Sequence, residues 1–130
     1  ISPKALKIGN DIKYYLEKHH VAYEEAERWD SVIGKIDVLY QTRVQKERFK
    51  SMREYEKHKG KYTLTLNEEK KMKKKSIIMH PLPRVDEIAP EVDSSPKAAY
   101  FRQAGYGLLV RMGILHFLLK RQATYRPQNR

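Results

Sequence analysis

The amino-acid sequence predicts an α/β fold: a partial, open and mainly parallel sheet flanked by helices, with a long helix at the end of the chain. Short apolar runs alternate with segments of helical periodicity, which is typical of layered α/β folds. Two of these runs, residues 36–40 and 76–79, have the length of buried strands, and a loop follows each directly. So few strands indicate part of a larger sheet.

Composition limits the classes of function. The 130 residues suit a single domain with one core, and the absence of cysteine excludes disulfides, thiolate catalysis and cysteine zinc sites. There is no secretory signal pattern and no apolar run long enough to cross a membrane, so no membrane contact is expected. Twenty-seven Lys and Arg against 16 Asp and Glu give a net charge of +11. This charge suits an anionic partner such as RNA, acidic protein or anionic substrate, and equally suits a solvated basic surface.

The first part of the chain predicts a helix followed by a strand. Asn10 is the expected N-cap of a helix over residues 11–20, and residues 21–24 read as a short strand. One face of that helix is formed by Ile12, Tyr15, Leu16 and His19. His19 and His20 are adjacent, so on a helix they point about 100° apart and are poorly placed to bind one metal ion. We predict no metal site.

The strand at residues 36–40 leads into the first candidate site. Arg43 follows the strand at its carboxyl end, where open α/β folds place ligands. Arg43 and Gln45 are two residues apart and share one side in extended geometry. An arginine fork with an amide suits a ligand that carries a carboxylate. Glu47 is expected to pair with Arg43 or Arg48 and hold the fork; the alternative is a surface salt bridge of little energetic weight.

Two further helices are predicted before the second strand. Ser51 caps a helix over residues 52–59 that Gly60 ends, and residues 62–65 are strand-like. Asn67 opens the next helix, which begins with acidic residues and ends in a lysine run at 70–75. This order complements the helix dipole, which we prefer to an RNA-binding patch as the reason for the lysines.

The second candidate site is the stiff loop after residues 76–79, which reads His80-Pro81-Leu82-Pro83-Arg84. Pro81 and Pro83 fix φ, remove two backbone donors and push the residues before them toward extended geometry. The loop carbonyls therefore have few local partners and can point at a ligand. The alternative is an ordinary proline-rich turn.

A long helix is expected at the end of the chain. A helical turn is predicted over residues 86–92, and residues 93–96 should cap a helix from about Lys97, with a break near Gly105 and Gly107. The segment that begins at Leu108 and ends at Lys120 is apolar on most sides, so it needs a second body to pack against. We divide the chain into a domain at residues 1–120 and a basic tail at 121–130.

Three blocks resemble the aspartate transcarbamoylase family: residues 37–49 (DVLYQTRVQKERF), 79–88 (MHPLPRVDEI) and 98–104 (AAYFRQA) with the continuation at 110–112. Their order and separations also fit, and the likeness covers most of residues 1–120 but not the basic tail. The family joins carbamoyl phosphate to the amino group of aspartate in pyrimidine synthesis. Its chains have a carbamoyl-phosphate domain and an aspartate domain and assemble as trimers. The resemblance identifies this chain as most of the aspartate domain.

The resemblance implies roles for particular residues. Arg43 and Gln45 match residues that hold the aspartate carboxylates. Pro81 and Leu82 match the loop whose carbonyls face the reacting amine and carbamoyl group, and the Leu82–Pro83 bond is expected to be cis. Glu47, His80 and Arg84 are supporting residues. No cofactor and no side-chain nucleophile is implied, since catalysis there is positioning and charge stabilisation.

The departures from the family predict an inactive chain. The phosphate-binding Ser-Thr-Arg-Thr signature is missing, as are the groups that polarise the carbamoyl carbonyl. We therefore expect an aspartate-binding part of a transcarbamoylase that needs a carbamoyl-phosphate domain, or another protein, over the helix from Leu108 to Lys120. Two alternatives stay open: a non-catalytic structural subunit, for example of an organellar ribonucleoprotein, and a module that binds aspartate without chemistry. A cytoplasmic location is expected, with a mitochondrial one as the alternative, and the basic tail leaves nucleic acid open as a partner.

Overall fold

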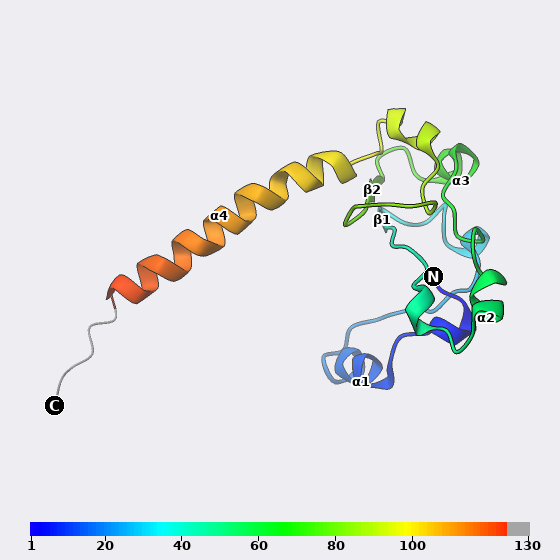
Figure 1. Ribbon diagram of the computed structural model, residues 1–130, viewed down its shortest axis with the longest axis horizontal. Coiled ribbons are helices and arrows are strands. Elements are labelled where there is room, and N and C mark those ends of the chain that lie inside the picture. The colour runs from blue at the N-terminus through cyan, green and yellow to red at the C-terminus, as the bar shows by residue number, and fades with distance from the viewer. Residues whose placement is uncertain (125–130) are drawn as a thin grey trace.

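The computed structural model describes residues 1–124, and the side chains of residues 1–120. A body of short elements holds the N-terminus, and one long helix, α4 (Tyr100–Thr124), extends away from it (Figure 1). The shorter elements are the 3₁₀ turns Lys4–Leu6, Trp29–Ser31, Lys46–Arg48 and Pro90–Ser94 and the helices α1 (Asn10–Lys18), α2 (Met52–Glu56) and α3 (Leu66–Lys71).

The sheet consists of two parallel strands, β1 (Val38–Tyr40) and β2 (Ile77–Met79), with Leu39 opposite Ile78. There are also two isolated parallel bridges: one joins Ile78 of β2 to Ala98, and the other joins Leu64 to Ile88. The predicted α/β class, with a partial parallel sheet and a long terminal helix, is confirmed. The predicted strand at residues 62–65 is reduced to the single bridge at Leu64.

The core lies between the sheet, α3 and the segment that precedes α4. Its fully buried side chains are Leu64, Ile78, Ile88, Val92 and Tyr100. Leu39 is the one residue of β1 that points into this core, since its neighbours in the strand are half exposed. Fully burying such a side chain contributes about 1.5–3 kcal/mol. These few residues anchor both strands and the start of α4.

Two helix starts are built by local capping. The Ser51 hydroxyl accepts a hydrogen bond from the Glu54 amide at 3.2 Å, which confirms Ser51 as the cap of α2. The helix α3 was predicted to open at Asn67; it begins one residue earlier, at Leu66, and Thr65 caps it. The Glu68 carboxylate accepts a hydrogen bond from the Thr65 amide at 3.2 Å, which completes a capping box.

Two predictions in the N-terminal part are wrong. The N-cap of α1 is Gly9, and Asn10 is already helical. Residues 21–24 do not form a strand. His20 adopts a left-handed conformation (φ 54°), and the Val21 amide donates to the Leu16 carbonyl at 2.9 Å. Val21 thus completes the end of α1, and no strand of the described part of the chain lies beside this segment.

The helix α4 is continuous, which corrects the predicted break near Gly105 and Gly107. Glycine keeps its backbone donor and acceptor, so it costs about 1 kcal/mol in a helix interior without breaking the hydrogen-bond ladder. The helix begins at Tyr100, and the turn predicted at residues 86–92 lies at Pro90–Ser94. It runs through Thr124, so residues 121–124 of the basic tail are helical; the rest of that tail lies outside the described residues.

The apolar side chains in the middle part of α4 are exposed. From Leu108 to Leu119 they are between 51% (Leu118) and 66% (Leu119) accessible. Within the described residues, no helix is both long and apolar enough to span a lipid bilayer. The second body that the sequence predicts for this helix is therefore not provided by the body of this chain.

Candidate functional site

The two candidate loops begin at the same end of the sheet, where the carboxyl ends of both strands lie. Because β1 and β2 are parallel and Tyr40 lies opposite Met79, their carboxyl ends coincide. Arg43 follows the end of β1, and Pro81 and Leu82 follow the end of β2. Both candidate motifs therefore start at this end of the sheet, which we call the rim. The roles assigned to these residues stay predictions.

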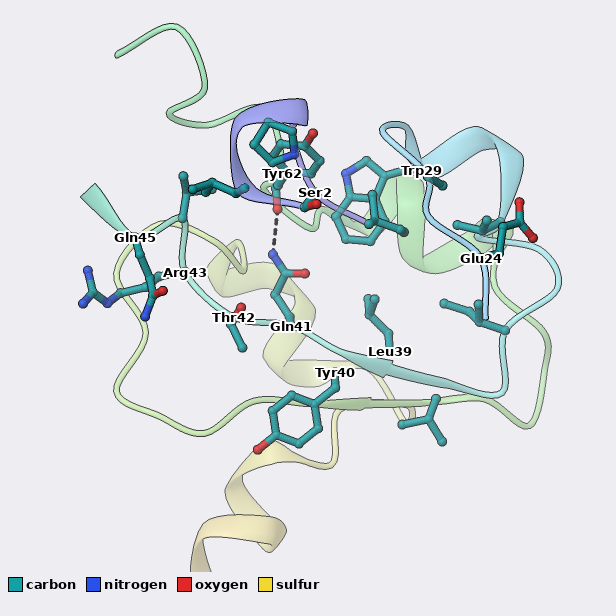
Figure 2. A pocket seen from close by; sticks show the side chains of 18 of the residues that line it. Ser2, Glu24, Trp29, Leu39, Tyr40, Gln41, Thr42, Arg43, Gln45 and Tyr62 are labelled. Carbon is teal, nitrogen blue, oxygen red and sulfur yellow. Dashed lines mark hydrogen bonds between the residues drawn. The ribbon is translucent and has the colours of Figure 1, made fainter. Parts of the chain in front are cut away.

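A cavity of about 780 Å³ runs from this rim along β1. Its polar end is lined by Thr42, Arg43, Gln45 and Arg48, and Figure 2 shows Arg43 and Gln45 next to one another there. Its inner part is lined by Trp29, Val32, Ile36, Leu39 and Gln41. Pro81 and Leu82 do not line this cavity.

Arg43 is held by Glu47 in the predicted pairing. Nη1 of Arg43 donates to one carboxylate oxygen of Glu47 at 3.2 Å, and Nη2 donates to the other. A backbone hydrogen bond and the Arg43 guanidinium hold the pKa of Glu47 below its usual value. Both side chains are about half exposed, so the pair orients the fork and adds little stability. The fork stays accessible to a carboxylate ligand.

Gln41, which lies directly after β1, is a residue of the site that the sequence did not predict. Gln41 is 6% exposed, and its Nε2 donates to the Tyr62 carbonyl at 2.8 Å (Figure 2). The Tyr62 hydroxyl in turn donates to the Glu27 carbonyl at 3.1 Å. An amide directly after an apolar strand was the only sequence signal for this role. These bonds fix one wall of the cavity.

The buried side chain of His80 holds the proline loop through a hydrogen bond from the Leu82 amide. It is 2% exposed, and its Nδ1 accepts a hydrogen bond from the Leu82 amide at 2.8 Å. A backbone amide can only donate, so Nδ1 carries no proton and the ring is neutral with its proton on Nε2. Nε2 lies 2.7 Å from Oε1 of Glu87, to which it donates. Leu82 is not extended as predicted for the residue before Pro83, but has a φ of 44°. Its amide is tied through His80 to the buried carboxylate of Glu87.

Glu87 is buried as a carboxylate with several donors around it. Its Oε2 accepts from the amides of Val85 at 3.0 Å and Asp86 at 3.1 Å. Burial by itself raises the pKa of Glu87, but the backbone hydrogen bonds and the one from His80 lower it, and the net pKa lies below its usual value. Glu87 therefore stays charged and accepts all three bonds near neutral pH.

The same loop is tied to α4 and β1 through Gln103. Oε1 of Gln103 accepts from the His80 amide at 3.0 Å, and its Nε2 donates to the Tyr40 hydroxyl at 3.2 Å. One glutamine thus connects the first turn of α4 with both strand ends. Any motion of α4 relative to the sheet therefore acts on the rim.

Arg84 is paired with Asp93, and its role as a supporting residue stays a prediction. Nη2 donates to Oδ2 of Asp93 at 2.6 Å, Nη1 donates to Oδ1, and the Tyr100 hydroxyl also donates to Asp93. The Arg84 guanidinium lies 5.7 Å from the Tyr100 ring centre. Burial and the Asp93 hydrogen bond raise the pKa of Tyr100 to about 12. The cluster fastens the loop to the start of α4.

We expect Asp93→Asn to destabilise the fold only where Asp93 is ionised. The Arg84 hydrogen bonds hold the pKa of Asp93 below its usual value. The ionised Asp93 therefore contributes to the free energy of unfolding above pH about 4, the ordinary pKa of an unfolded Asp. This contribution is lost as the pH falls through the lowered pKa of the folded state. Near pH 7 the substitution should cost about 1–3 kcal/mol. Urea unfolding of both proteins at pH 7 and pH 2.5 checks this. An equal difference at both pH values contradicts it.

The rim offers two kinds of group to a ligand. A guanidinium fork and an amide, such as those of Arg43 and Gln45, can bind a carboxylate. Backbone carbonyls, such as those of Pro81 and Leu82, can accept hydrogen bonds from an amine. The arrangement suits a small amino acid that carries an additional carboxylate.

The chain is similar to known transcarbamoylases over nearly its whole length. A sequence model of the "Aspartate/ornithine carbamoyltransferase, Asp/Orn binding domain" family matches residues 1–118. The aspartate carbamoyltransferase catalytic subunit of Hyperthermus butylicus is 47% identical over 123 residues, 94% of this chain and 39% of that protein. The chloroplastic aspartate carbamoyltransferase of Arabidopsis thaliana is 49% identical over 120 residues, 92% of this chain and 31% of that protein.

Solved structures give the same result. The catalytic subunit of M. jannaschii aspartate transcarbamoylase superposes with a TM-score of 0.85 at 46% identity, over 96% of this chain and 40% of that one. The Trypanosoma cruzi enzyme in complex with N-(phosphonacetyl)-L-aspartic acid superposes with a TM-score of 0.77 at 39% identity, over 88% of this chain and 38% of that one.

These comparisons and the rim geometry define an α/β ligand-binding domain of the carbamoyltransferase class. The chain belongs to the aspartate/ornithine carbamoyltransferase family and is a partial C-terminal, aspartate-binding domain of the aspartate transcarbamoylase type. It spans about two fifths or less of the length of the relatives described above. The expected cis bond between Leu82 and Pro83 is present.

Proposed function

We propose that this chain is the aspartate-binding part of an aspartate transcarbamoylase. The observation that carries the proposal is the Arg43 guanidinium, which Glu47 orients and which lies beside Gln45. It lies at the end of the sheet where the Pro81–Leu82 loop also begins. The fork and the amide take the two carboxylates of L-aspartate. The Pro81 and Leu82 carbonyls accept from its amino group, and this leaves the nitrogen lone pair pointing at the second substrate.

The reaction requires positioning rather than covalent catalysis. The aspartate nitrogen attacks the carbonyl carbon of carbamoyl phosphate, the C–N bond forms, and the bond to phosphate breaks. The proton lost by the amine leaves with the phosphate. Holding two reactants in attack geometry can lower the barrier by about 7–11 kcal/mol. The His80–Glu87 pair contributes by fixing the Leu82 amide and hence the direction of the loop carbonyls.

The chain alone is inactive under this proposal. The family's phosphate-binding signature does not occur in its sequence. The apolar side of α4 is the contact for the carbamoyl-phosphate domain, because that surface is exposed here and apolar surface of this extent is rarely left in water. The homotrimer of relatives is the expected assembly once that domain is present.

Complementation tests the proposal. We expect no carbamoyl aspartate from the chain alone, and turnover when the carbamoyl-phosphate domain of a relative is added. In the complemented enzyme Arg43→Ala should lower kcat/KM about 10²–10³-fold or more, since it removes a charged donor pair from the bound carboxylate. Arg53→Ala, which changes an exposed arginine on α2, serves as the matched control and should leave the rate unchanged.

Direct binding separates the remaining alternatives. An NMR titration with L-aspartate should move the signals of Arg43 and Gln45 in the complemented enzyme. Aspartate binding without turnover would replace the proposal with a module that binds aspartate but performs no chemistry. If the complex forms but shows neither aspartate binding nor turnover, a structural subunit is favoured. The net charge of +11 and the exposed α4 are the observations that support that alternative.

A further inference from the structure

The backbone pairing of the two strands ends before the two candidate loops reach their polar residues. Its last hydrogen bond runs from the Gln41 amide to the Met79 carbonyl at 2.9 Å. Arg43 lies two residues beyond this bond on one side, and Leu82 lies three residues beyond it on the other. Among the described residues, no hydrogen bond joins the two loops directly. The ladder by itself therefore does not fix the separation of the loops.

One side chain of α4 continues the connection where the ladder stops. Nε2 of Gln103 donates to the Tyr40 hydroxyl at 3.2 Å, and its Oε1 accepts from the His80 amide at 3.0 Å. Tyr40 is the last residue of β1, and His80 follows β2 directly. Figure 2 shows the Tyr40 side chain next to the start of α4. We call these two hydrogen bonds the Gln103 bridge. It joins the strand ends at the points where the two loops begin.

The backbone of Gln103 is held in place by the sheet. The Ala99 amide donates to the Ile78 carbonyl at 2.9 Å, and the Gln103 amide donates to the Ala99 carbonyl at 2.8 Å. Tyr100, in the same turn, is fully buried. The first turn of α4 is thus fixed against β2, and both polar atoms of the Gln103 side chain are used in the bridge. A group held in this way can set the position of others.

The separation of the loops decides which ligand fits the rim. Under the proposed function, the Arg43 guanidinium binds a carboxylate of L-aspartate while the Pro81 and Leu82 carbonyls accept from its amino group. A ligand held at both ends requires that the protein groups stand apart by the length of the ligand itself. A misplacement of about 1 Å in such a site can cost about 10²-fold in rate. A connection that fixes this separation is therefore a determinant of substrate choice.

We propose that Gln103 is a positioning residue for the reaction. It sets the separation between the Arg43 guanidinium and the Pro81–Leu82 carbonyls, and so fits the rim to L-aspartate rather than to the longer L-glutamate. Gln103 acts through Tyr40 and His80 rather than by contact with the substrate. The inference rests on the proposed function, and it adds a residue of α4 to the groups that select the substrate.

Tyr40→Phe in the complemented enzyme tests the inference. The substitution removes the hydroxyl that accepts from Gln103 and keeps the ring, and Tyr40 is 53% exposed, so the fold is retained. We expect the KM for L-aspartate to rise about three- to tenfold, the effect of one hydrogen bond, with the KM for carbamoyl phosphate unchanged. Competitive inhibition by L-glutamate should weaken less than this. A loss of folded enzyme would instead lower kcat and leave both KM values unchanged.

Gln103→Met removes both hydrogen bonds of the bridge at nearly constant side-chain volume. Added to Gln103→Met, Tyr40→Phe should raise the KM for L-aspartate no further, because the two substitutions remove the same connection. In the chain alone, Gln103→Met should speed exchange of the His80 amide about tenfold or more and leave exchange of the Gln41 amide, which belongs to the β1–β2 ladder, unchanged. Tyr14→Phe removes an exposed hydroxyl on α1 and is the matched control, which should change neither KM.

The inference and the proposed function fail in different ways. A complemented parent with neither turnover nor aspartate binding overturns the proposed function and the inference with it. If aspartate binds without turnover, the same three- to tenfold increase is expected in its dissociation constant. An active parent together with an unchanged KM for L-aspartate in Tyr40→Phe overturns the inference alone, as does additivity of Tyr40→Phe and Gln103→Met. If Gln103→Met does not fold, the KM values of Tyr40→Phe decide the question.

Discussion

Glu87→Ala should lower the free energy of unfolding by about 3–5 kcal/mol. The substitution leaves three donors without an acceptor: Nε2 of His80 and the amides of Val85 and Asp86. All three surround a side chain that is only 4% exposed, so water does not replace the lost bonds without a rearrangement of the loop. Small domains have about 5–15 kcal/mol of stability in total, so the loss is a large share. Urea unfolding followed by circular dichroism measures it.

Two further variants make this test specific. Asp86→Ala changes the exposed neighbour and should shift stability by less than about 0.5 kcal/mol. Glu87→Gln keeps the size but puts an NH₂ group opposite either the two amides or Nε2 of His80, so we expect an intermediate loss. An ¹⁵N NMR spectrum should show the proton of His80 on Nε2 in the parent protein. A proton on Nδ1, or a Glu87→Ala loss equal to that of Asp86→Ala, would contradict the described network.

Leu115→Asp should abolish assembly of this chain with the carbamoyl-phosphate domain at any salt concentration. Leu115 is 60% exposed in the chain alone and lies within the apolar stretch of α4. Buried at an interface, it would contribute about 1.5–3 kcal/mol, whereas an unpaired carboxylate there costs several times more. Sedimentation velocity of the mixed components measures complex formation.

The controls separate packing from charge. Leu115→Met conserves volume and apolar character, so it should leave the complex within about tenfold of the parent affinity. Charge reversal at Arg126 and Arg130, which lie outside the described residues, should weaken assembly at low salt and have less effect at high salt. A monodisperse monomer that does not bind the domain, with Leu115 exposed, would rule out α4 as the contact.

The features that the sequence alone predicted are those that local chemistry decides. The apolar runs at 36–40 and 76–79 became the parallel strands β1 and β2, and Ser51 caps α2 as expected. Glu47 was expected to pair with Arg43 or Arg48, both close to it in the sequence, and it pairs with Arg43. The resemblance, rather than spacing, supplied the cis bond before Pro83.

The errors arose where neighbouring elements override local preference. Residues 21–24 have strand-like composition, but the Val21 amide completes α1 and no strand lies alongside. Gly105 and Gly107 weaken a helix locally, yet glycine keeps its backbone donor and acceptor, and α4 is continuous through both. In both cases the backbone hydrogen bonds of a helix, α1 or α4, decided the structure against the local sequence preference.

The sequence by itself therefore determined which residues stand at the ends of the two strands and what chemistry they carry. Only the tertiary structure decided what holds them there. Gln103 lies 23 residues beyond His80, and Gln41 reaches the carbonyl of Tyr62, 21 residues away. The burial of the Trp29 indole, which has no hydrogen-bond partner among the described residues, likewise exists only once the chain is folded. Such contacts depend on which backbone groups distant segments leave unpaired, and the periodicity of the sequence does not predict this.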